Sequence, residues 1–218
     1  MKKNKVLSFK YFLFDFIRIN GIPALLWFRP KKYYLHEEDR HQIKGGALLI
    51  SNHISLVDPM YLLLSIRSRR LHIICMDELI HSKFQRWIFI HACLCIPITR
   101  SNVTLSQVKE IITRLKNGEV VSMFPEGKIN DNNEGIQKFK SGMVMMAYRG
   151  NAPIIPVYIK RRKHWYSRLE VAIGSPIDVS TFKSGEVLSH EDNERACLEI
   201  ERREKELEEF MKSKEKKK

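Results

Sequence analysis

The sequence predicts an α/β fold in which a largely parallel or mixed central sheet is flanked by helices. Short apolar runs of strand type, such as residues 47–51 and 120–124, alternate along the chain with segments of helical periodicity. Strands that are apolar on both faces are typical of parallel sheets covered by helices on both sides. The 218 residues, 44% of them hydrophobic, are enough for one such domain and exclude a wholly disordered chain.

The expected elements follow in chain order from periodicity and turn residues. Strands are expected at residues 47–51, 71–75, 95–98, 120–124, 154–159 and 169–173. Helices are expected at residues 59–66, 78–91, around 108–115 before the stop signal Asn117-Gly118, and 141–148. The domain organisation predicted from these elements is an N-terminal interfacial helical segment (1–35), an α/β domain (36–188), and a charged C-terminal helix and tail (189–218).

The N-terminal segment is aromatic and apolar over residues 7–28, but Lys10, Asp15 and Arg18 interrupt it. Its longest uncharged run, residues 19–28, is well short of the roughly 20 apolar residues that a membrane span needs. A basic, aromatic, interrupted helix is typical of one that lies in the bilayer interface. The alternative, a helix that packs on the domain's own core, is equally compatible with the pattern.

The net charge of +13 comes from 38 basic and 25 acidic residues and is concentrated in two places. Residues 1–35 carry +7 and residues 160–168 carry +5, whereas residues 191–218 carry −1. Such patches attract nucleic acid or anionic lipid. Because the chain shows no nucleic-acid motif and its aromatic residues gather in an apolar helix, we expect an anionic membrane surface as partner and no nucleic acid.

The four cysteines are too few in a chain of this length for a disulfide framework, and their spacing is not that of a zinc site. We therefore expect buried thiols, no metal site, and a location on the cytosolic side.

The first candidate catalytic segment follows the strand at residues 47–51 and contains His53 and Asp58. On an ideal helix these two side chains would lie about 140° apart, and the residue before Pro59 avoids helical geometry. The segment must therefore be a loop or single turn, which can fold the carboxylate back against the imidazole to make a general base. The alternatives are a helix N-cap for Asp58 and a core histidine for His53.

Two further segments at strand ends suit anion binding. Glu126, Gly127 and Lys128 begin a polar loop in which backbone amides and a cation could cradle an anion. Arg100 follows the end of the strand at residues 95–98 and could hold a phosphate in bidentate fashion. The alternatives are a turn with an exposed glutamate and a surface arginine.

These segments together resemble the glycerolipid acyltransferase superfamily, in particular the 1-acylglycerol-3-phosphate (lysophosphatidic acid) acyltransferases. The resemblance covers about residues 40–175. It rests on Asn52, His53 and Asp58, on Arg100, on Phe124-Pro125-Glu126-Gly127, on Phe139-Lys140-Ser141-Gly142, and on Ile154-Ile155-Pro156-Val157.

The resemblance implies an enzyme of phospholipid biosynthesis in which His53, oriented by Asp58, deprotonates the sn-2 hydroxyl of lysophosphatidic acid. The hydroxyl would attack a thioester donor, acyl-CoA or acyl-carrier protein, and no tightly bound cofactor is needed. Arg100, Glu126, Gly127 and Lys128 would bind the lysophospholipid acceptor, at the cytoplasmic face of a membrane in a peripheral or monotopic protein.

One departure from the family pattern concerns the acceptor site. Ile129 occupies the position where the family usually has an arginine after Phe-Pro-Glu-Gly, and Lys128 is the nearest replacement cation. Another lysolipid acceptor is therefore an alternative. From a different class, the +13 charge also allows a nonenzymatic basic protein that binds lipid or nucleic acid.

Overall fold

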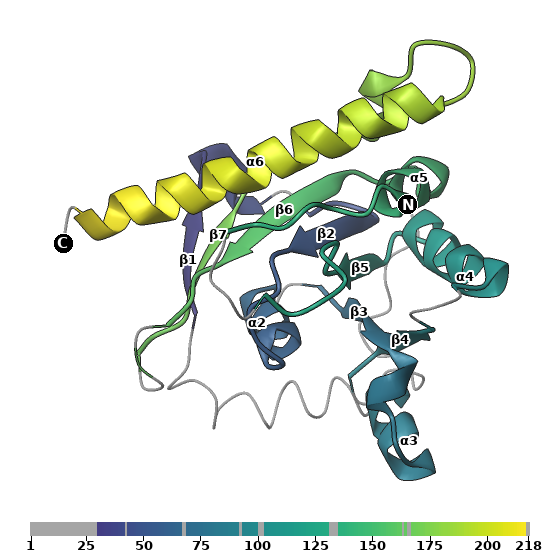
Figure 1. Cartoon of the computed structure of the whole chain (residues 1–218), viewed down its shortest axis with the longest axis horizontal. Coiled ribbons are helices and arrows are strands. Elements are labelled where there is room, and N and C mark those ends of the chain that lie inside the picture. The colour runs from purple at the N-terminus through teal and green to yellow at the C-terminus, as the bar shows by residue number, and fades with distance from the viewer. Residues whose placement is uncertain are drawn as a thin grey trace.

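The computed structural model describes residues 30–41, 43–66, 69–91, 93–99, 103–130, 135–162, 164 and 167–216. Their core is a seven-stranded sheet with the strand order β1-β7-β6-β2-β5-β3-β4 (Figure 1). The strands are β1 (Lys31–Tyr34), β2 (Ala47–Ser51), β3 (Leu71–Met76), β4 (Cys95–Ile98), β5 (Val120–Met123), β6 (Ile154–Ile159) and β7 (Glu170–Ile173).

The sheet is mixed. The strands β2 to β6 run parallel to one another, β7 is antiparallel to β6, and β1 is parallel to β7. The carboxyl ends of five strands therefore meet at one edge, which is where open α/β sheets place their ligand sites. The predicted α/β class with a parallel or mixed sheet flanked by helices is confirmed.

Helices cover both faces of the sheet. They are α2 (Asp58–Ser65), α3 (Lys83–His91), α4 (Leu105–Lys116), α5 (Gly142–Gly150) and α6 (His190–Lys216), with short 3₁₀ turns at η3 (Glu37–His41), η4 (Asp77–Leu79) and η5 (Val179–Phe182). One core joins α4, α5 and α6 to the strands, and a second core on the opposite face holds α2. In Figure 1, α6 lies across the top of the molecule and α3 projects at the bottom.

The predicted helix at residues 78–91 was wrong in its first turn. Residues 77–79 form the 3₁₀ turn η4, and the α-helix starts only at Lys83. The break has a local cause, because Ser82 and Gln85 exchange hydrogen bonds as a capping box: Ser82 Oγ accepts from Gln85 N (3.1 Å) and Gln85 Oε1 accepts from Ser82 N (3.1 Å).

The C-terminal end of residues 1–35, a segment predicted to be helical, also differs from the prediction. Residues 31–34 form β1, which extends the sheet at β7. Tyr33 fixes this pairing with a side-chain hydrogen bond from its hydroxyl to Glu170 Oε1 (3.1 Å). The rest of the predicted docking segment, residues 1–29, lies outside the described residues.

The charged C-terminal helix is found as α6, 27 residues long. Ala196, Ile200, Leu207 and Met211 are buried along one side of it, as a helix of 3.6 residues per turn requires, and they meet α5, β6 and β7. Within the described residues, no helix is both long enough and apolar enough to cross a bilayer.

Candidate active site

The candidate site begins where β2 ends. The buried Asn52 side chain takes the place of a strand neighbour: its Nδ2 donates to Ile159 O (2.9 Å), and its Oδ1 accepts from Ile159 N (2.7 Å). This double contact ties the end of β2 to the end of β6 and fixes the backbone that carries His53. The sequence placed Asn52 in a motif but did not indicate this role.

His53 and Asp58 are brought into direct contact. His53 Nδ1 lies 2.9 Å from Asp58 Oδ2, and the same oxygen accepts from the backbone N–H groups of Ile54 (2.7 Å) and Ser55 (2.8 Å). The Asp58 side chain is fully buried, whereas that of His53 is 16% exposed. Because a carboxylate only accepts, Nδ1 carries the proton and Nε2 is left as the basic nitrogen of the ring.

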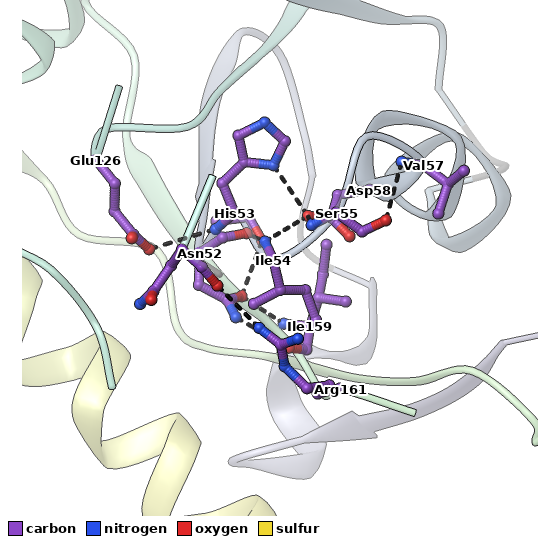
Figure 2. Close-up of polar contacts among 11 residues, drawn as sticks. Asn52, His53, Ile54, Ser55, Val57, Asp58, Glu126, Ile159 and Arg161 are labelled. Atoms are coloured by element: carbon purple, nitrogen blue, oxygen red, sulfur yellow. Dashed lines mark hydrogen bonds and ion pairs between the residues drawn. The ribbon is translucent and has the colours of Figure 1, made fainter. Parts of the chain in front are cut away.

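Asp58 is the first residue of α2, yet its carboxylate does not cap that helix. The N-cap is Val57, which makes no side-chain capping bond, and the amides that Asp58 binds precede the helix. The turn instead folds the carboxylate back onto the imidazole (Figure 2). A ring held at one nitrogen and reachable at the other can take a proton from a bound hydroxyl.

The loop after β5 encloses His53 from the other side. The Phe124 ring stacks on the imidazole, with centroids 4.1 Å apart and an angle of 19° between the planes. Glu126 Oε1 accepts from His53 N (3.3 Å), and Asn130 N donates to His53 O (2.7 Å). Figure 2 shows His53 between Glu126 and Asp58. The loop therefore positions the histidine through its ring and its backbone.

Glu126 itself is almost buried. The residue is only 6% exposed to solvent, and its Oε2 atom has no hydrogen-bond partner among the described residues. Burial, the largest cause, raises the pKa of Glu126, and the backbone N–H groups of His53 and Gln137 act in the opposite direction. Its carboxylate therefore meets backbone N–H groups, among them that of His53.

Gly127 turns the loop with a positive φ of 70°, and its N–H donates to Phe124 O (3.1 Å). A Cβ there would lie 3.0 Å from Lys140 Nζ, so the glycine leaves space for the end of that lysine. Lys140 N also donates to Pro125 O (3.1 Å). Lys128 points to solvent as an exposed side chain. The cation beside the loop is thus Lys140, which the Phe-Lys-Ser-Gly segment indicated but to which we assigned no role.

The basic cluster at residues 160–168 is partly used inside the fold. Arg161 Nη2 donates to Asn130 O (2.8 Å), so it braces the loop that holds His53. Lys160 forms ion pairs with Glu170 (3.0 Å) and Glu215 (2.7 Å). A small pocket next to the end of β2 has Asn52, Ile54, Asn130, Tyr158, Arg161 and Glu208 among its lining residues, and His53 is not one of them.

Two expectations about ligand groups have different outcomes. Arg100 lies outside the described residues, so its predicted place at the site stays a prediction. Among the residues that are described, no group of three or more His, Cys, Asp or Glu side chains could hold a metal ion.

The candidate site is thus a histidine–aspartate pair at the carboxyl edge of a mixed sheet covered by helices. The chain belongs to the Acyltransferase family, whose pattern it matches over residues 32–160. It is 28% identical over 145 residues to the 1-acyl-sn-glycerol-3-phosphate acyltransferase of Bacillus subtilis (strain 168), covering 63% of this chain and 70% of that one.

The fold has a solved counterpart. The chain is similar to PlsC, the 1-acyl-sn-glycerophosphate (LPA) acyltransferase of Thermotoga maritima, with a TM-score of 0.64 and 21% identity over 97% of this chain and 84% of that one. The predicted resemblance to the lysophosphatidic acid acyltransferases is confirmed, and the chain is an acyltransferase.

Proposed function

We propose that this enzyme transfers a fatty acyl group from a thioester donor to the sn-2 hydroxyl of lysophosphatidic acid, which gives phosphatidic acid. The observation that carries the proposal is the 2.9 Å contact between His53 Nδ1 and Asp58 Oδ2, which leaves Nε2 available. The acceptor is taken from the Bacillus subtilis relative, whose name specifies 1-acyl-sn-glycerol 3-phosphate. The donor is acyl-CoA or acyl-carrier protein.

In the proposed mechanism, His53 Nε2 removes the proton of the sn-2 hydroxyl as its oxygen attacks the thioester carbonyl carbon. The tetrahedral intermediate then collapses, the carbon–sulfur bond breaks, and the imidazolium returns the proton to the leaving thiolate. Asp58 holds the ring and stabilises the imidazolium, because its buried carboxylate accepts from Nδ1 throughout. No acyl-enzyme forms, and no resident cofactor is required.

The acceptor's glycerol phosphate would be held by the loop after β5 together with Arg100. Gly127 shapes this loop through its positive φ, with its own N–H bound to Phe124 O, and Lys128 supplies a cation exposed to solvent. Lys140, whose ammonium lies beside Gly127, adds a second positive charge at the same place. Glu126 contributes by fixing the His53 backbone rather than by meeting phosphate, since two anions would repel.

We further propose that the enzyme works as a peripheral or monotopic protein at the cytoplasmic face of a membrane, where acceptor and product reside. Within residues 1–35, whose charge is +7, the part that precedes β1 would dock on anionic lipid, residues 36–188 would carry the reaction, and residues 189–218 would contribute the charged helix and tail.

The test is turnover of lysophosphatidic acid by the purified full chain with each thioester donor. His53→Ala should abolish phosphatidic acid formation. Asp58→Asn should lower kcat about ten-thousandfold, because an amide cannot stabilise the imidazolium and can hold the ring in the wrong tautomer. His190→Ala is the matched control, since that side chain is 82% exposed on α6. Turnover by His53→Ala at the parent rate would refute the mechanism.

A second candidate acceptor is another lysolipid. The observation in its favour is Ile129, which stands at the usual arginine position of the phosphate site. Screening several lysolipids against one donor separates the two candidates, because both require His53 but differ in the headgroup. Replacing Ile129→Arg should raise turnover of lysophosphatidic acid relative to the other acceptors.

A further inference from the structure

Strongly exposed apolar side chains gather at one edge of the sheet. Of nine such large side chains among the described residues, seven lie in the segments that follow the carboxyl ends of β2, β3 and β4. We call these seven the carboxyl-edge rim: Leu56, Val57, Met60, Phe84, Trp87, Val103 and Leu105. It is the same edge that carries His53.

The two aromatic members of the rim lie on α3. Phe84 is 70% exposed and Trp87 is 51% exposed, and no residue of this helix is fully buried. At about 100° per residue, Trp87 and Ile88 fall within about 60° of Phe84 on the helix surface. Phe89 falls about 140° away and contacts the core instead. The helix therefore packs with one side and presents the opposite side, which is aromatic, to solvent.

The charged side chains of α3 itself are both basic. Residues 79–91 contain Lys83 and Arg86 and no acidic residue. Lys83 is exposed, and Arg86 forms an ion pair with Asp77 (2.5 Å) before the helix. Aromatic rings with flanking cations are the composition that favours the interface of an anionic bilayer. The rim consists of separate side chains on three segments, and a fluid lipid surface accepts such an array without a shaped groove.

We propose that the carboxyl-edge rim, led by Phe84 and Trp87 of α3, inserts into an anionic lipid surface and turns the His53 edge towards the leaflet. This contact is distinct from the docking expected of residues 1–29, because it uses side chains of the folded domain. This proposal rests on the proposed function in one respect, which is that an enzyme acting on a lysolipid must bind a lipid surface. The contact itself is measured without turnover, and His53→Ala should bind vesicles as the parent does.

The first test is sedimentation of the full chain with vesicles of phosphatidylcholine mixed with phosphatidylglycerol, and with vesicles of phosphatidylcholine alone. The double variant Phe84→Gln, Trp87→Gln should lower the partition coefficient on mixed vesicles about tenfold. Lys83→Gln should reduce the difference between the two vesicle types. The matched control is Val187→Gln, Leu198→Gln, because these side chains are 71% and 63% exposed outside the rim. The proposal would be overturned if vesicle binding fell equally in both double variants, or if it did not fall in Phe84→Gln, Trp87→Gln.

A second measurement places Trp87 directly. With Trp27→Phe and Trp165→Phe, Trp87 is the one tryptophan left of the three in the sequence. Its emission should shift to the blue when mixed vesicles are added and should be quenched by brominated lipid. If α3 were covered by residues 1–29 or by a second copy of the chain, Trp87 would show no lipid quenching. In that case Phe84→Gln, Trp87→Gln would change the melting temperature or the oligomeric state, while its partition onto vesicles would equal that of the parent. This outcome would also refute the proposal.

Discussion

Glu204 of α6 is a carboxyl group that is completely shielded from water beneath the active site. Neither of its oxygens has a hydrogen-bond partner among the described residues. Burial, the largest cause, raises the pKa of Glu204 well above its usual value, and the charge of Glu126 acts in the same direction. The Asn52 backbone N–H lies close enough to lower the pKa of Glu204 without meeting the geometry of a hydrogen bond, and the nearby Glu208 and Glu201 raise it further. A buried acid in such surroundings is held in its neutral form.

The raised pKa predicts how stability depends on pH. The folded protein holds a proton that the unfolded chain releases above about pH 4.5, so the free energy of unfolding falls as pH rises through the folded pKa. Glu204→Gln should remove this loss of stability, so its free energy of unfolding should exceed that of the parent most at high pH. Thermal denaturation from acidic to alkaline pH checks it, with Glu209→Gln on the exposed side of α6 as control. Because burial also raises the pKa of Glu126, part of the slope should remain. The prediction would be contradicted if the melting temperatures of the parent and of Glu204→Gln changed with pH in parallel.

At the scale of elements, the packing of α4 against the start of β2 and the end of α5 depends on two glycines that both face Leu115. A Cβ on Gly46 would lie 2.1 Å from the carbonyl oxygen of Leu115, and a Cβ on Gly150 would lie 2.7 Å from the Leu115 Cβ. Arg69 closes the same corner by donating to Gly45 O (2.8 Å) and Gly118 O (2.6 Å). The backbone of α4 can approach the sheet this closely only because a side chain is missing.

Gly46→Ala should therefore push α4 away from the sheet. Overpacking of this kind costs about 1–3 kcal/mol, which for a chain of this size corresponds to a melting temperature lowered by about 2–4 °C per kcal/mol. Gly142→Ala is the control, since nothing lies within 4 Å of its Cβ position, and alanine is favoured in a helix. Calorimetry decides, and an unchanged melting temperature for Gly46→Ala would show that α4 adjusts freely.

Element types were predictable where the apolar pattern was continuous, as in β2 and β6, which have the predicted bounds. The strand β1 was missed because Lys31–Tyr34 is paired through β7, a partner more than 130 residues away. The contact between His53 and Asp58 followed from local geometry, since Pro59 excludes a continuous helix. The brace from Arg161 to Asn130 could not be predicted, because a charge cluster does not reveal which of its members turn inward.

The whole molecule depends on α6 more than its charged sequence suggests. One core of the sheet includes Ala196 and Ile200 of this helix, and a second cluster joins Leu207 and Met211 to Ala172 of β7. Glu201 Oε1 also accepts from Phe139 N (2.8 Å), next to the loop that borders the site. In Figure 1 the helix runs the length of the molecule above β6. These contacts argue that α6 completes the domain.

Removal of α6 tests this at the scale of the chain. A protein ending at residue 188 should lose the cooperative unfolding transition and aggregate. Two apolar clusters would become exposed to water, and each Å² of apolar surface exposed costs about 25 cal/mol of stability. A protein ending at Lys212 keeps Met211 and should unfold as the full chain does, since it loses only the exposed end and the ion pair from Lys160 to Glu215, a contact at the surface. Denaturation followed by circular dichroism distinguishes the two. A soluble, cooperatively folding protein of residues 1–188 would mean that α6 is an appendage.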